Sequence, residues 1–358
     1  MNSMSQAYLI LENGQVYQGQ RFGAPGQIQA ELVFTTGMVG YLETLTDPSY
    51  HGEIVVQTFP LIGNYGVIPQ DFESDRPRLS AYVVRQVCAA PSNFRSEGAL
   101  DDYLRQQGVI GLCGVDTRQL TRTLRESGVM NAAIVDQLPD DMDAFTQALA
   151  ARSLSSDVYQ VTCSHPYTLG EGRRHVVLWD FGLKRAMAQA LMERGCRLTV
   201  MPAGSTAEEV LRCHPDGILL SNGPGDPVNY RAIVSQVGLA AAKGVPMMGI
   251  CLGHQLLALS QGAGRVKLKY GHRGANQPVR RLSDKKLFVT CQNHGYAILN
   301  DTLPDNAKPS YENINDLTNE GIEYQDKPAF SVQFHPEACA GPQDTAFLFD
   351  QFIQMMED

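Results

Sequence analysis

The second half of the chain alternates between short apolar runs and stretches with helical periodicity. The apolar runs lie at 175–179, 197–201, 218–221 and 246–250, and the helical stretches at 184–194, 207–213, 230–243 and 255–260. Strands that alternate with helices in this way form a parallel sheet covered by helices. Later strand-like runs at 287–291, 323–324 and 329–334 are expected to extend the sheet, and 345–356 to form a last helix. We therefore predict a doubly wound α/β domain over residues 175–358.

Residues 1–165 show a different pattern, in which strand-like runs dominate. These runs lie at 8–11, 15–17, 31–36, 54–59, 82–88 and 109–115. Asn13-Gly14, between the first two runs, is the strongest short signal for a hairpin. Helices are expected at 100–107, at 117–127 after the N-cap residue Asp116, and at 140–152. The first half is therefore predicted to be a mixed, β-rich domain, and the turn-rich residues 166–174 a linker.

Composition agrees with two globular domains and argues against several kinds of partner. The chain has 358 residues, of which 43% are hydrophobic and 19% charged, and its formal net charge is -9. An acidic balance argues against broad binding to nucleic acid or to an anionic membrane, since both require a basic face. No apolar run reaches the ~20 residues of a membrane helix. The N-terminus also lacks the basic and apolar regions of a secretory signal.

The eight cysteines are scattered through apolar contexts and form no CxxC pair. A chain of this length does not need disulfides for stability, so this usage predicts a protein of the reducing cytoplasm. The residues around each cysteine must then show which of them is reactive.

Cys251 has the most informative surroundings. It is the centre of a G-x-C-x-G pattern, Gly249–Gly253, between the apolar run 246–250 and a helical stretch. A sharp strand-to-helix turn of this kind exposes a nucleophile, and the helix N-terminus supplies backbone N–H groups for an oxyanion. A small buried core cysteine is the alternative interpretation, and the motif alone leaves the two near balance.

A base for this thiol is expected at His335. His335-Pro336-Glu337 directly follows the apolar run 330–334. In extended chain, residues two apart point to the same side, so His335 and Glu337 can face each other as a base and its orienting carboxylate. A surface histidine beside a solvated glutamate is the alternative. Taken together with the Cys251 turn, the pattern favours a Cys-His-Glu catalytic triad.

Other polar segments follow predicted strands and are candidates for the walls of the same site. Residues 221–227 could be a plain turn, but loops at the carboxyl ends of parallel strands are where α/β sheets bind ligands. No Gly-Lys-Ser/Thr follows this loop, so it is not a phosphate loop. Residues 292–296 follow another strand and could equally be an exposed turn. His254, on the helix after Cys251, is expected to pack or hydrogen-bond rather than act as the base.

The histidines show no metal-binding pattern. They contain no HxH or HExxH spacing and no paired cysteines, so we expect no metal ligands in the chain. A basic cluster is formed by Arg265, Lys267, Lys269, His272 and Arg273. We interpret it as solvated surface or, alternatively, as a docking face for an acidic partner.

Several of these motifs together resemble a known enzyme family. GICLGHQLLAL, LSNGPGDP, QNHGYAI and FHPE are similar to motifs of the class I, or triad, glutamine amidotransferases, from about residue 176 to the C-terminus. In the first half, LVFTTGMVGYLETLTD, FPLIGN, SNFR and GVDTRQLTR resemble the N-terminal domain of the small subunit of carbamoyl phosphate synthetase. The resemblance therefore spans nearly the whole chain, with the two domains in the same order.

This resemblance implies a role for each matching residue. Cys251 would attack the side-chain amide of glutamine to form a γ-glutamyl thioester, with His335 as base and Glu337 as its orienting group. The remaining implied residues are expected to bind glutamine or the oxyanion: Gly223, Gly225, Leu252, Gln255, Asn293, Gly295 and Tyr296, with Ser49 from the N-terminal domain completing the pocket. Lys184 falls near the site in the same pattern, without an assigned role.

The resemblance also implies a division of labour. A separate large subunit would use ATP, Mg²⁺ and bicarbonate with the released ammonia to make carbamoyl phosphate for arginine or pyrimidine biosynthesis, and this chain would need no cofactor of its own. The N-terminal domain would then contact the partner in a heterodimer and help form the ammonia tunnel.

Three other functions remain as alternatives. The chain could serve another amidotransferase, such as one feeding anthranilate or GMP synthesis, although the N-terminal domain argues against this. It could be a free-standing thiol hydrolase of γ-glutamyl compounds. It could also be a non-catalytic regulatory subunit, but the intact Cys, His and Glu argue against that function.

Overall fold

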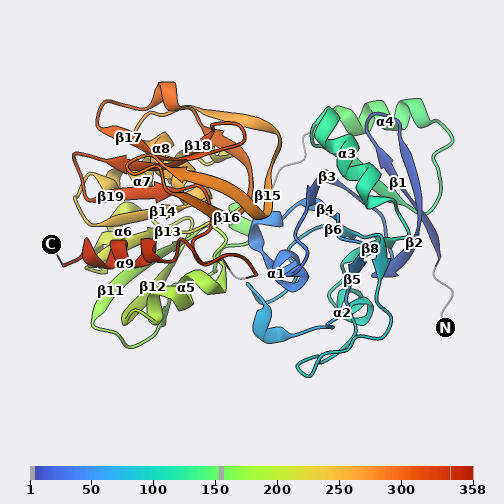
Figure 1. The fold of residues 1–358 in the computed structure, drawn as a ribbon, viewed down its shortest axis with the longest axis horizontal. Coiled ribbons are helices and arrows are strands. Elements are labelled where there is room, and N and C mark those ends of the chain that lie inside the picture. Colours follow the sequence, from blue (N-terminus) through green and yellow to red (C-terminus); the bar gives the residue numbers. More distant parts are fainter. Residues whose placement is uncertain (1–4, 153–156, 339, 358) are drawn as a thin grey trace. The chain divides into compact units, whose positions relative to one another are not determined.

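The computed structural model describes residues 5–152, 157–338 and 340–357, so that Cys339 lies outside the described residues. The chain divides into two compact units, Met1–Ser156 and Asp157–Asp358, each with its own sheet and hydrophobic core (Figure 1). Among the described residues, no helix combines the length and the apolar character that a membrane crossing requires.

The first unit is built around a closed barrel with the strand order β1-β2-β8-β6-β4-β3-β9. Its strands are β1 (Gln6–Leu11), β2 (Val16–Gly23), β3 (Ile28–Thr35), β4 (Glu53–Gln57), β6 (Ala81–Val83), β8 (Ile110–Cys113) and β9 (Met130–Val135). β3, β4, β6 and β8 pair in parallel, and the other pairs are antiparallel. β9 closes the barrel by pairing with both β1 and β3. It is absent from the predicted strands because Ala132 and Ala133 give little β signal.

Local signals in this unit are confirmed. β1 and β2 pair antiparallel around Asn13-Gly14, where Gly14 has a φ of 86°. Asp116 caps the following helix by accepting a hydrogen bond of 3.1 Å from the backbone N–H of Gln119. The helices are α1 (Tyr41–Thr46), α2 (Leu100–Gln106), α3 (Thr117–Ser127) and α4 (Met142–Ala150), and the short strands β5 (Leu61–Ile62) and β7 (Gln86–Val87) pair outside the barrel.

The second unit contains a ten-stranded sheet with the order β10-β12-β11-β13-β14-β19-β18-β17-β15-β16. The parallel part consists of β12 (Cys196–Pro202), β11 (Arg174–Asp180), β13 (Gly217–Leu220), β14 (Met247–Ile250) and β19 (Ala329–Val332). The antiparallel part consists of β18 (Asn319–Tyr324), β17 (Ala307–Asn313), β15 (Arg265–Arg281) and β16 (Leu287–Ile298), with β10 (Tyr167–Leu169) at the other edge.

Helices cover both faces of the parallel part, as predicted for a doubly wound sheet. One face packs against α6 (Ala207–Arg212), α7 (Arg231–Ala241) and α8 (Leu252–Ser260). The other packs against α5 (Arg185–Met192) and α9 (Phe347–Gln354). Successive residues of β11 serve the two cores in turn: Val177 lies in the first and Val176 in the second, and both are fully buried. The central strands are therefore apolar on both sides.

The segment expected to be a linker differs from the prediction. Residues 166–174 include β10, which pairs antiparallel with β12, and the first residue of β11. A three-residue strand is too short to give a periodic signal, and its flanking turn residues resemble those of a loop. The structure also shows β15 and β17, which the hydrophobic pattern did not indicate.

Candidate active site

Cys251 lies at a sharp turn between β14 and α8. Its backbone has φ 54° and ψ −106°, a conformation that is costly for a residue with a side chain. The backbone N–H of Cys251 donates to the carbonyl of Val332 on β19 (2.9 Å), and the side chain is only 2% exposed. The parallel strands therefore hold the thiol in a strained and buried position.

This turn requires glycine on either side of Cys251, because no side chain would fit at positions 249 and 253. A Cβ added to Gly253 would lie 2.2 Å from the carbonyl oxygen of Leu220 on β13. A Cβ on Gly249 would lie 2.7 Å from the carbonyl oxygen of Gly253. The G-x-C-x-G pattern is thus explained by the close approach of α8 to two neighbouring strands.

His335 and Glu337 face each other beyond the end of β19. Nδ1 of His335 lies 2.6 Å from Oε1 of Glu337, and both residues are buried. The backbone N–H of His335 donates to the carbonyl of Cys291 on β16 (2.9 Å), which fixes the chain at this point. The two side chains therefore meet as predicted, but across a turn rather than along extended chain, since the backbone N–H of Ala338 donates to the carbonyl of His335 (3.3 Å).

Lys184, the residue before α5, completes a row of buried charges. Its Nζ lies 2.9 Å from the same Oε1 of Glu337, and its side chain is 6% exposed. Burial works against the charged form of Glu337, but Lys184 and His335 lower the pKa of this carboxyl to about 2. Glu337 is therefore a carboxylate at neutral pH and can hold both cations. The sequence motifs predict Lys184 near the site but give it no role.

The charge on Glu337 acts in turn on His335. Burial disfavours the charged ring, but the carboxylate raises the pKa of His335 well above its usual value. Lys184 opposes this rise and the Cys251 thiol adds to it. No hydrogen bond to Nε2 of His335 is formed by the described part of the chain. The ring is thus oriented through one nitrogen and available through the other.

One wall beside the sulfur comes from β16. Sγ of Cys251 lies 3.6 Å from the backbone carbonyl oxygen of Asn293. Gln255, on α8, uses its side-chain amide to hold the same strand, donating to the carbonyl of Tyr296 (2.9 Å) and to Oε1 of Gln333 (2.9 Å). Gly295 lies between Asn293 and Tyr296 on this strand. Gln333 is not among the predicted site residues. It directly follows the buried strand β19, and its sequence context gives no local sign of a role in the site.

The loop after β13 packs directly against the Cys251 turn. A Cβ on Gly223 would lie 2.2 Å from the carbonyl oxygen of Phe181 and 2.8 Å from Cδ2 of Leu252, so only glycine fits. Gly225 has a φ of 87°, which also favours glycine. The carbonyl of Ser221 accepts a hydrogen bond of 3.0 Å from the N–H of Gly253. The loop is therefore fixed against the N-terminus of α8.

Ser49 belongs to the first unit. It lies in the short turn η1 (Pro48–Tyr50), is 8% exposed, and donates its backbone N–H to Oδ1 of Asp47 (2.9 Å). Its expected part in a pocket with the second unit stays a prediction.

His254 lies on α8, three residues after Cys251, and is fully buried. Its Nδ1 lies 2.8 Å from the hydroxyl of Ser331 on β19. Burial lowers the pKa of His254 to about 3, so the ring is neutral and packed beneath the turn. This arrangement agrees with the packing role expected for it.

The predicted basic cluster on β15 is not a uniform surface patch. His272 and Arg273 are 7% and 5% exposed, and both are paired there with His294 and Asn293 of β16. Arg265 pairs with Asp226 (2.5 Å), and its guanidinium lies over the ring of Tyr296 (5.2 Å to the centroid). Interpretation of all five as solvated surface or a docking face was therefore wrong for His272 and Arg273.

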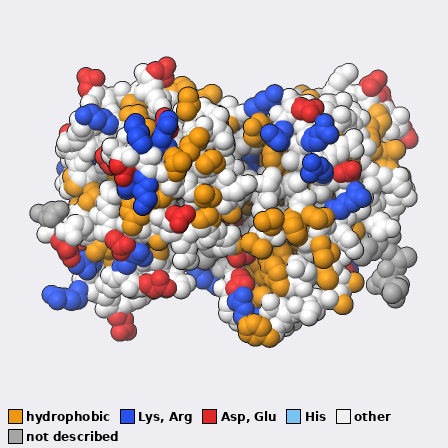
Figure 2. All heavy atoms as spheres, in the orientation of Figure 1, with side chains coloured by type: hydrophobic (Ala, Val, Ile, Leu, Met, Phe, Trp, Pro, Cys, Tyr) orange, Lys and Arg blue, Asp and Glu red, His pale blue; other side chains and the backbone are white. Residues whose placement is uncertain are grey.

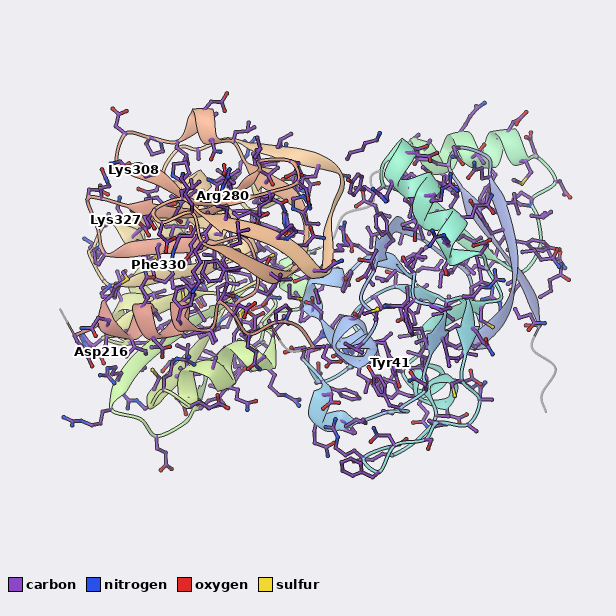
Figure 3. All side chains as sticks on the ribbon, viewed as in Figure 1. Tyr41, Asp216, Arg280, Lys308, Lys327 and Phe330 are labelled. Atoms are coloured by element: carbon purple, nitrogen blue, oxygen red, sulfur yellow. The ribbon has the colours of Figure 1, made fainter. Side chains whose placement is uncertain are left out.

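Other basic side chains are visible on the second unit (Figure 2), and Figure 3 labels Arg280, Lys308 and Lys327 there. Arg280 pairs with Glu312 of β17, and Lys327 pairs with Asp326 (2.7 Å). At least these two positive charges are therefore locally compensated.

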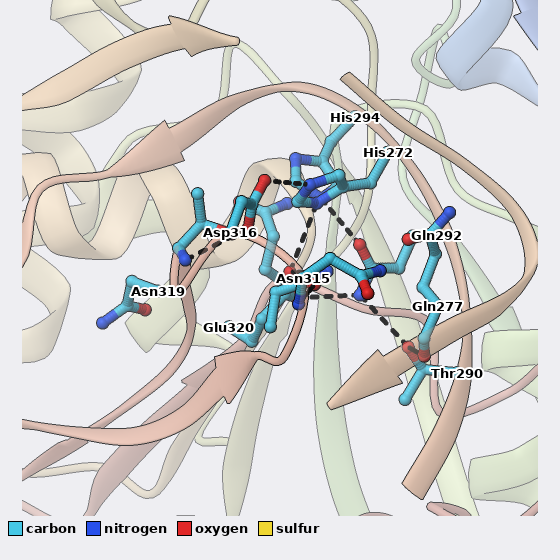
Figure 4. A network of polar contacts seen from close by, with 12 residues as sticks. His272, Gln277, Thr290, Gln292, His294, Asn315, Asp316, Asn319 and Glu320 are labelled. Carbon is cyan, nitrogen blue, oxygen red and sulfur yellow. Dashed lines mark hydrogen bonds and ion pairs between the residues drawn. The ribbon is translucent and has the colours of Figure 1, made fainter. Parts of the chain in front are cut away.

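A second buried polar cluster lies between β15, β16 and β18 (Figure 4). Nδ1 of His272 lies 3.2 Å from Nε2 of His294, and its Nε2 lies 2.8 Å from Oδ2 of Asp316. Burial disfavours a charged His272, but hydrogen bonds to Asp316 and Glu320 raise its pKa to about 9. Burial and the neighbouring His272 hold the pKa of His294 well below its usual value.

Comparison with known proteins identifies the family. The family model described as carbamoyl-phosphate synthase small chain, CPSase domain, matches residues 9–134, and the model of glutamine amidotransferase class-I matches residues 177–355. The carbamoyl phosphate synthase small chain of Syntrophotalea carbinolica is 45% identical over 369 residues, covering 98% of this chain and 98% of the relative. That of Chlorobaculum tepidum is 46% identical over 358 residues, with the same coverage of both chains. The chain therefore belongs to the carbamoyl-phosphate synthase small-chain family, and its second unit carries a class I glutamine amidotransferase domain.

Proposed function

We propose that this chain hydrolyses glutamine and delivers the ammonia to a separate large subunit that makes carbamoyl phosphate. The observation that carries the proposal is the contact of His335 with Glu337 at 2.6 Å beside a cysteine held in a strained turn. Family membership supports the reaction, and this geometry supports the roles of nucleophile, base and orienting carboxylate for these three buried residues.

The reaction begins with transfer of the Cys251 proton to Nε2 of His335. Sγ then attacks the side-chain carbonyl carbon of glutamine, and the raised pKa of His335 favours its holding the proton. The imidazolium returns this proton to the nitrogen as the C–N bond breaks, which releases ammonia and leaves the γ-glutamyl thioester. His335 next takes a proton from water, the oxygen attacks the thioester, and glutamate leaves as Cys251 regains its proton.

Backbone groups around the turn stabilise the oxyanion of both steps. The N–H groups of Leu252 and of Gly223 or Gly225 lie on the two segments that pack together beside Cys251. Preorganised donors of this kind are worth about 10²–10³ in rate each. Gln255, Asn293, Gly295 and Tyr296 bind the amino acid.

The large subunit carries the nucleotide chemistry in this proposal. It binds ATP and Mg²⁺ and combines ammonia with bicarbonate, while this chain needs no cofactor. The first unit forms the contact with the large subunit in a cytoplasmic heterodimer, and the carbamoyl phosphate enters arginine or pyrimidine biosynthesis.

The test is reconstitution with a large subunit from the same source. Carbamoyl phosphate is measured with ATP and bicarbonate, first with glutamine and then with ammonia. The proposal expects product from both nitrogen sources with the wild-type chain, and from ammonia alone with Cys251→Ser. Glutamine hydrolysis without product from either source would mean that the chain serves a different synthase. Full hydrolysis of γ-glutamyl peptides by the isolated chain would favour a free-standing hydrolase.

A further inference from the structure

The cluster at His272, His294 and Glu320 contains more hydrogen-bond acceptors than it has donors to satisfy. The three residues come from β15, β16 and β18, and all three are buried. Figure 4 shows their side chains converging, with Gln292 beside them. Nδ1 of His272 lies 3.4 Å from Oε1 of Glu320 and 3.2 Å from Nε2 of His294. Oε1 of Gln292 lies 3.0 Å from that same Nε2.

The outer contacts decide which atoms carry protons. Nδ1 of His294 faces the carbonyl oxygen of Tyr296 at 2.8 Å, so this nitrogen must donate and its Nε2 presents a lone pair. The amide of Gln292 uses its nitrogen to donate to Thr290 (3.1 Å) and Glu320 (3.0 Å), so its oxygen also presents lone pairs. Two acceptors, Nε2 of His294 and Oε1 of Gln292, therefore lie 3.0 Å apart, and neither atom carries a proton that it could donate to the other.

His272 can relieve only part of this repulsion. Its Nε2 is turned to the carboxylate of Asp316, so a single N–H at Nδ1 is the most that the ring can offer inward. That N–H would face both Nε2 of His294 and Oε1 of Glu320. A cation at the centre would satisfy all of these acceptors at once.

We propose that His272 Nδ1, His294 Nε2 and a carboxylate oxygen of Glu320 bind a divalent transition-metal ion, for which Zn²⁺ is the best match. The ligand atoms of these three residues all lie within 4.8 Å of one another. Two atoms that each lie about 2.0–2.1 Å from a tetrahedral Zn²⁺ are separated by roughly 3.3 Å. The two separations from His272 Nδ1, 3.2 Å to His294 and 3.4 Å to Glu320, match this value. Gln292 lies beside the fourth position, which its oxygen or a water would fill.

The groups around the proposed ligands support a metal site. A metal-binding histidine usually donates its other N–H to a carboxylate or a backbone carbonyl. His272 has Asp316 in that position and His294 has the carbonyl of Tyr296. The carboxylate of Glu320 is likewise held by Asn313, at 3.3 Å. Both rings and the carboxylate are thus oriented before an ion arrives.

Sequence spacing could not reveal this site, because each ligand comes from a different strand of the antiparallel part of the sheet. A bound ion would clamp β15 and β18 to β16, the strand that carries Asn293 and Tyr296. The inference does not depend on the proposed glutamine hydrolysis, because binding can be measured without substrate.

The experiment uses the full chain with the Cys251→Ser substitution, so that the thiol near His335 does not bind metal. Equilibrium dialysis against Zn²⁺ with metal analysis gives stoichiometry and affinity, and visible absorption with Co²⁺ reports tetrahedral coordination. We expect one ion per chain, and at least about 10-fold weaker binding after His272→Gln or Glu320→Gln. Asp316→Asn keeps all three ligands and should weaken binding by about 10–100-fold.

Two matched variants control for general effects. His175 on β11 contacts Thr199 on β12, outside the cluster. Asp326 matches Asp316 in exposure, since the side chain of Asp326 is 49% accessible and that of Asp316 is 42% accessible. His175→Gln and Asp326→Asn should bind Zn²⁺ like the parent. The proposal is overturned if the parent binds no Zn²⁺, or if Asp316→Asn and a folded His272→Gln bind it as the parent does.

Discussion

His335 and His272 are both buried histidines of the second unit with a carboxylate beside them, but their second nitrogens differ. Nδ1 of His335 contacts Glu337, while no described residue forms a hydrogen bond with its Nε2. In His272, Nε2 contacts Asp316 and Nδ1 faces both His294 and Glu320. A ring that is to move a proton needs one nitrogen open to the reacting group, whereas a ring closed on both sides can only hold its neighbours or an ion.

The position of each histidine in the sheet explains this difference. His335 follows the carboxyl end of β19, at the edge where parallel strands separate into loops and ligands bind. His272 lies within β15 and is paired across the ladder with His294 of β16. Polar groups of the neighbouring strands and loop therefore face both nitrogens of His272.

The largest expected effect comes from replacing the thiol of Cys251. Cys251→Ser should lower glutamine-dependent carbamoyl phosphate synthesis in the reconstituted complex by at least about 10³-fold, because the hydroxyl is a far weaker nucleophile. Ammonia-dependent synthesis should be kept, and it is the internal control for assembly. If the serine variant used glutamine as well as the wild type, Cys251 would not be the nucleophile.

Replacement of the two histidines tests the comparison directly. His335→Asn should lower the rate of glutamine hydrolysis by about 10²–10⁴-fold, since it removes the group proposed to transfer the proton. The loss in His272→Asn should be at least about 10-fold smaller. Both nitrogens of this ring face other groups, Asp316 on one side and His294 and Glu320 on the other. Single-turnover measurement of thioester formation separates the chemical step from binding. Equal losses would show that the closed ring also takes part in the chemistry.

Glu337→Gln is expected to have a smaller effect on rate and a distinct effect on acid stability. A pKa of about 2 against the usual 4.5 means that the carboxylate stabilises the fold above pH 4.5 and that this contribution is lost as the pH falls toward 2. The difference corresponds to about 3 kcal/mol. His335 does not add to this loss. A histidine with a raised pKa stabilises the fold fully at pH values below its usual pKa, and this stabilisation is lost only at higher pH.

Urea unfolding at a series of acid pH values measures this contribution. The free energy of unfolding should decrease in both proteins between about pH 5 and about pH 2. This decrease should be about 3 kcal/mol smaller in Glu337→Gln than in the wild type. Glu126→Gln, which changes a glutamate of α3 with a side chain 72% exposed, should follow the wild-type curve. Parallel curves for Glu337→Gln and the wild type would contradict the pairing with Lys184 and His335.

Local chemistry could be predicted from the sequence where the interacting residues are close along the chain. The turn at Cys251 and the facing of His335 and Glu337 need only a strand, a helix start and a spacing of two residues. The contact of Lys184 with Glu337 joins residues 153 positions apart and depends on the order of the strands. That order is set by long-range packing, which a hydrophobic pattern does not encode.

The same limit applies to the parts of the fold that were missed. Alternation of strands and helices indicates a parallel sheet, because each crossover is local and repeated. β15 departs from a regular period through register shifts between Lys267 and His272 and between Gly274 and Gln277. A strand interrupted in this way loses the alternation that would reveal it, and His272 lies at one of these register shifts.

The smallest expected effect concerns a third histidine, which lies closer in sequence to Cys251 than either of the other two. His254 is neutral and buried, with one nitrogen bonded to Ser331. His254→Gln should cost about 1 kcal/mol of stability through the altered hydrogen bond. The rate of glutamine hydrolysis should change by less than about 10-fold, because the ring supplies no proton to the sulfur. Thermal unfolding and steady-state kinetics measure the two effects. A loss as large as that of His335→Asn would transfer the role of base to His254.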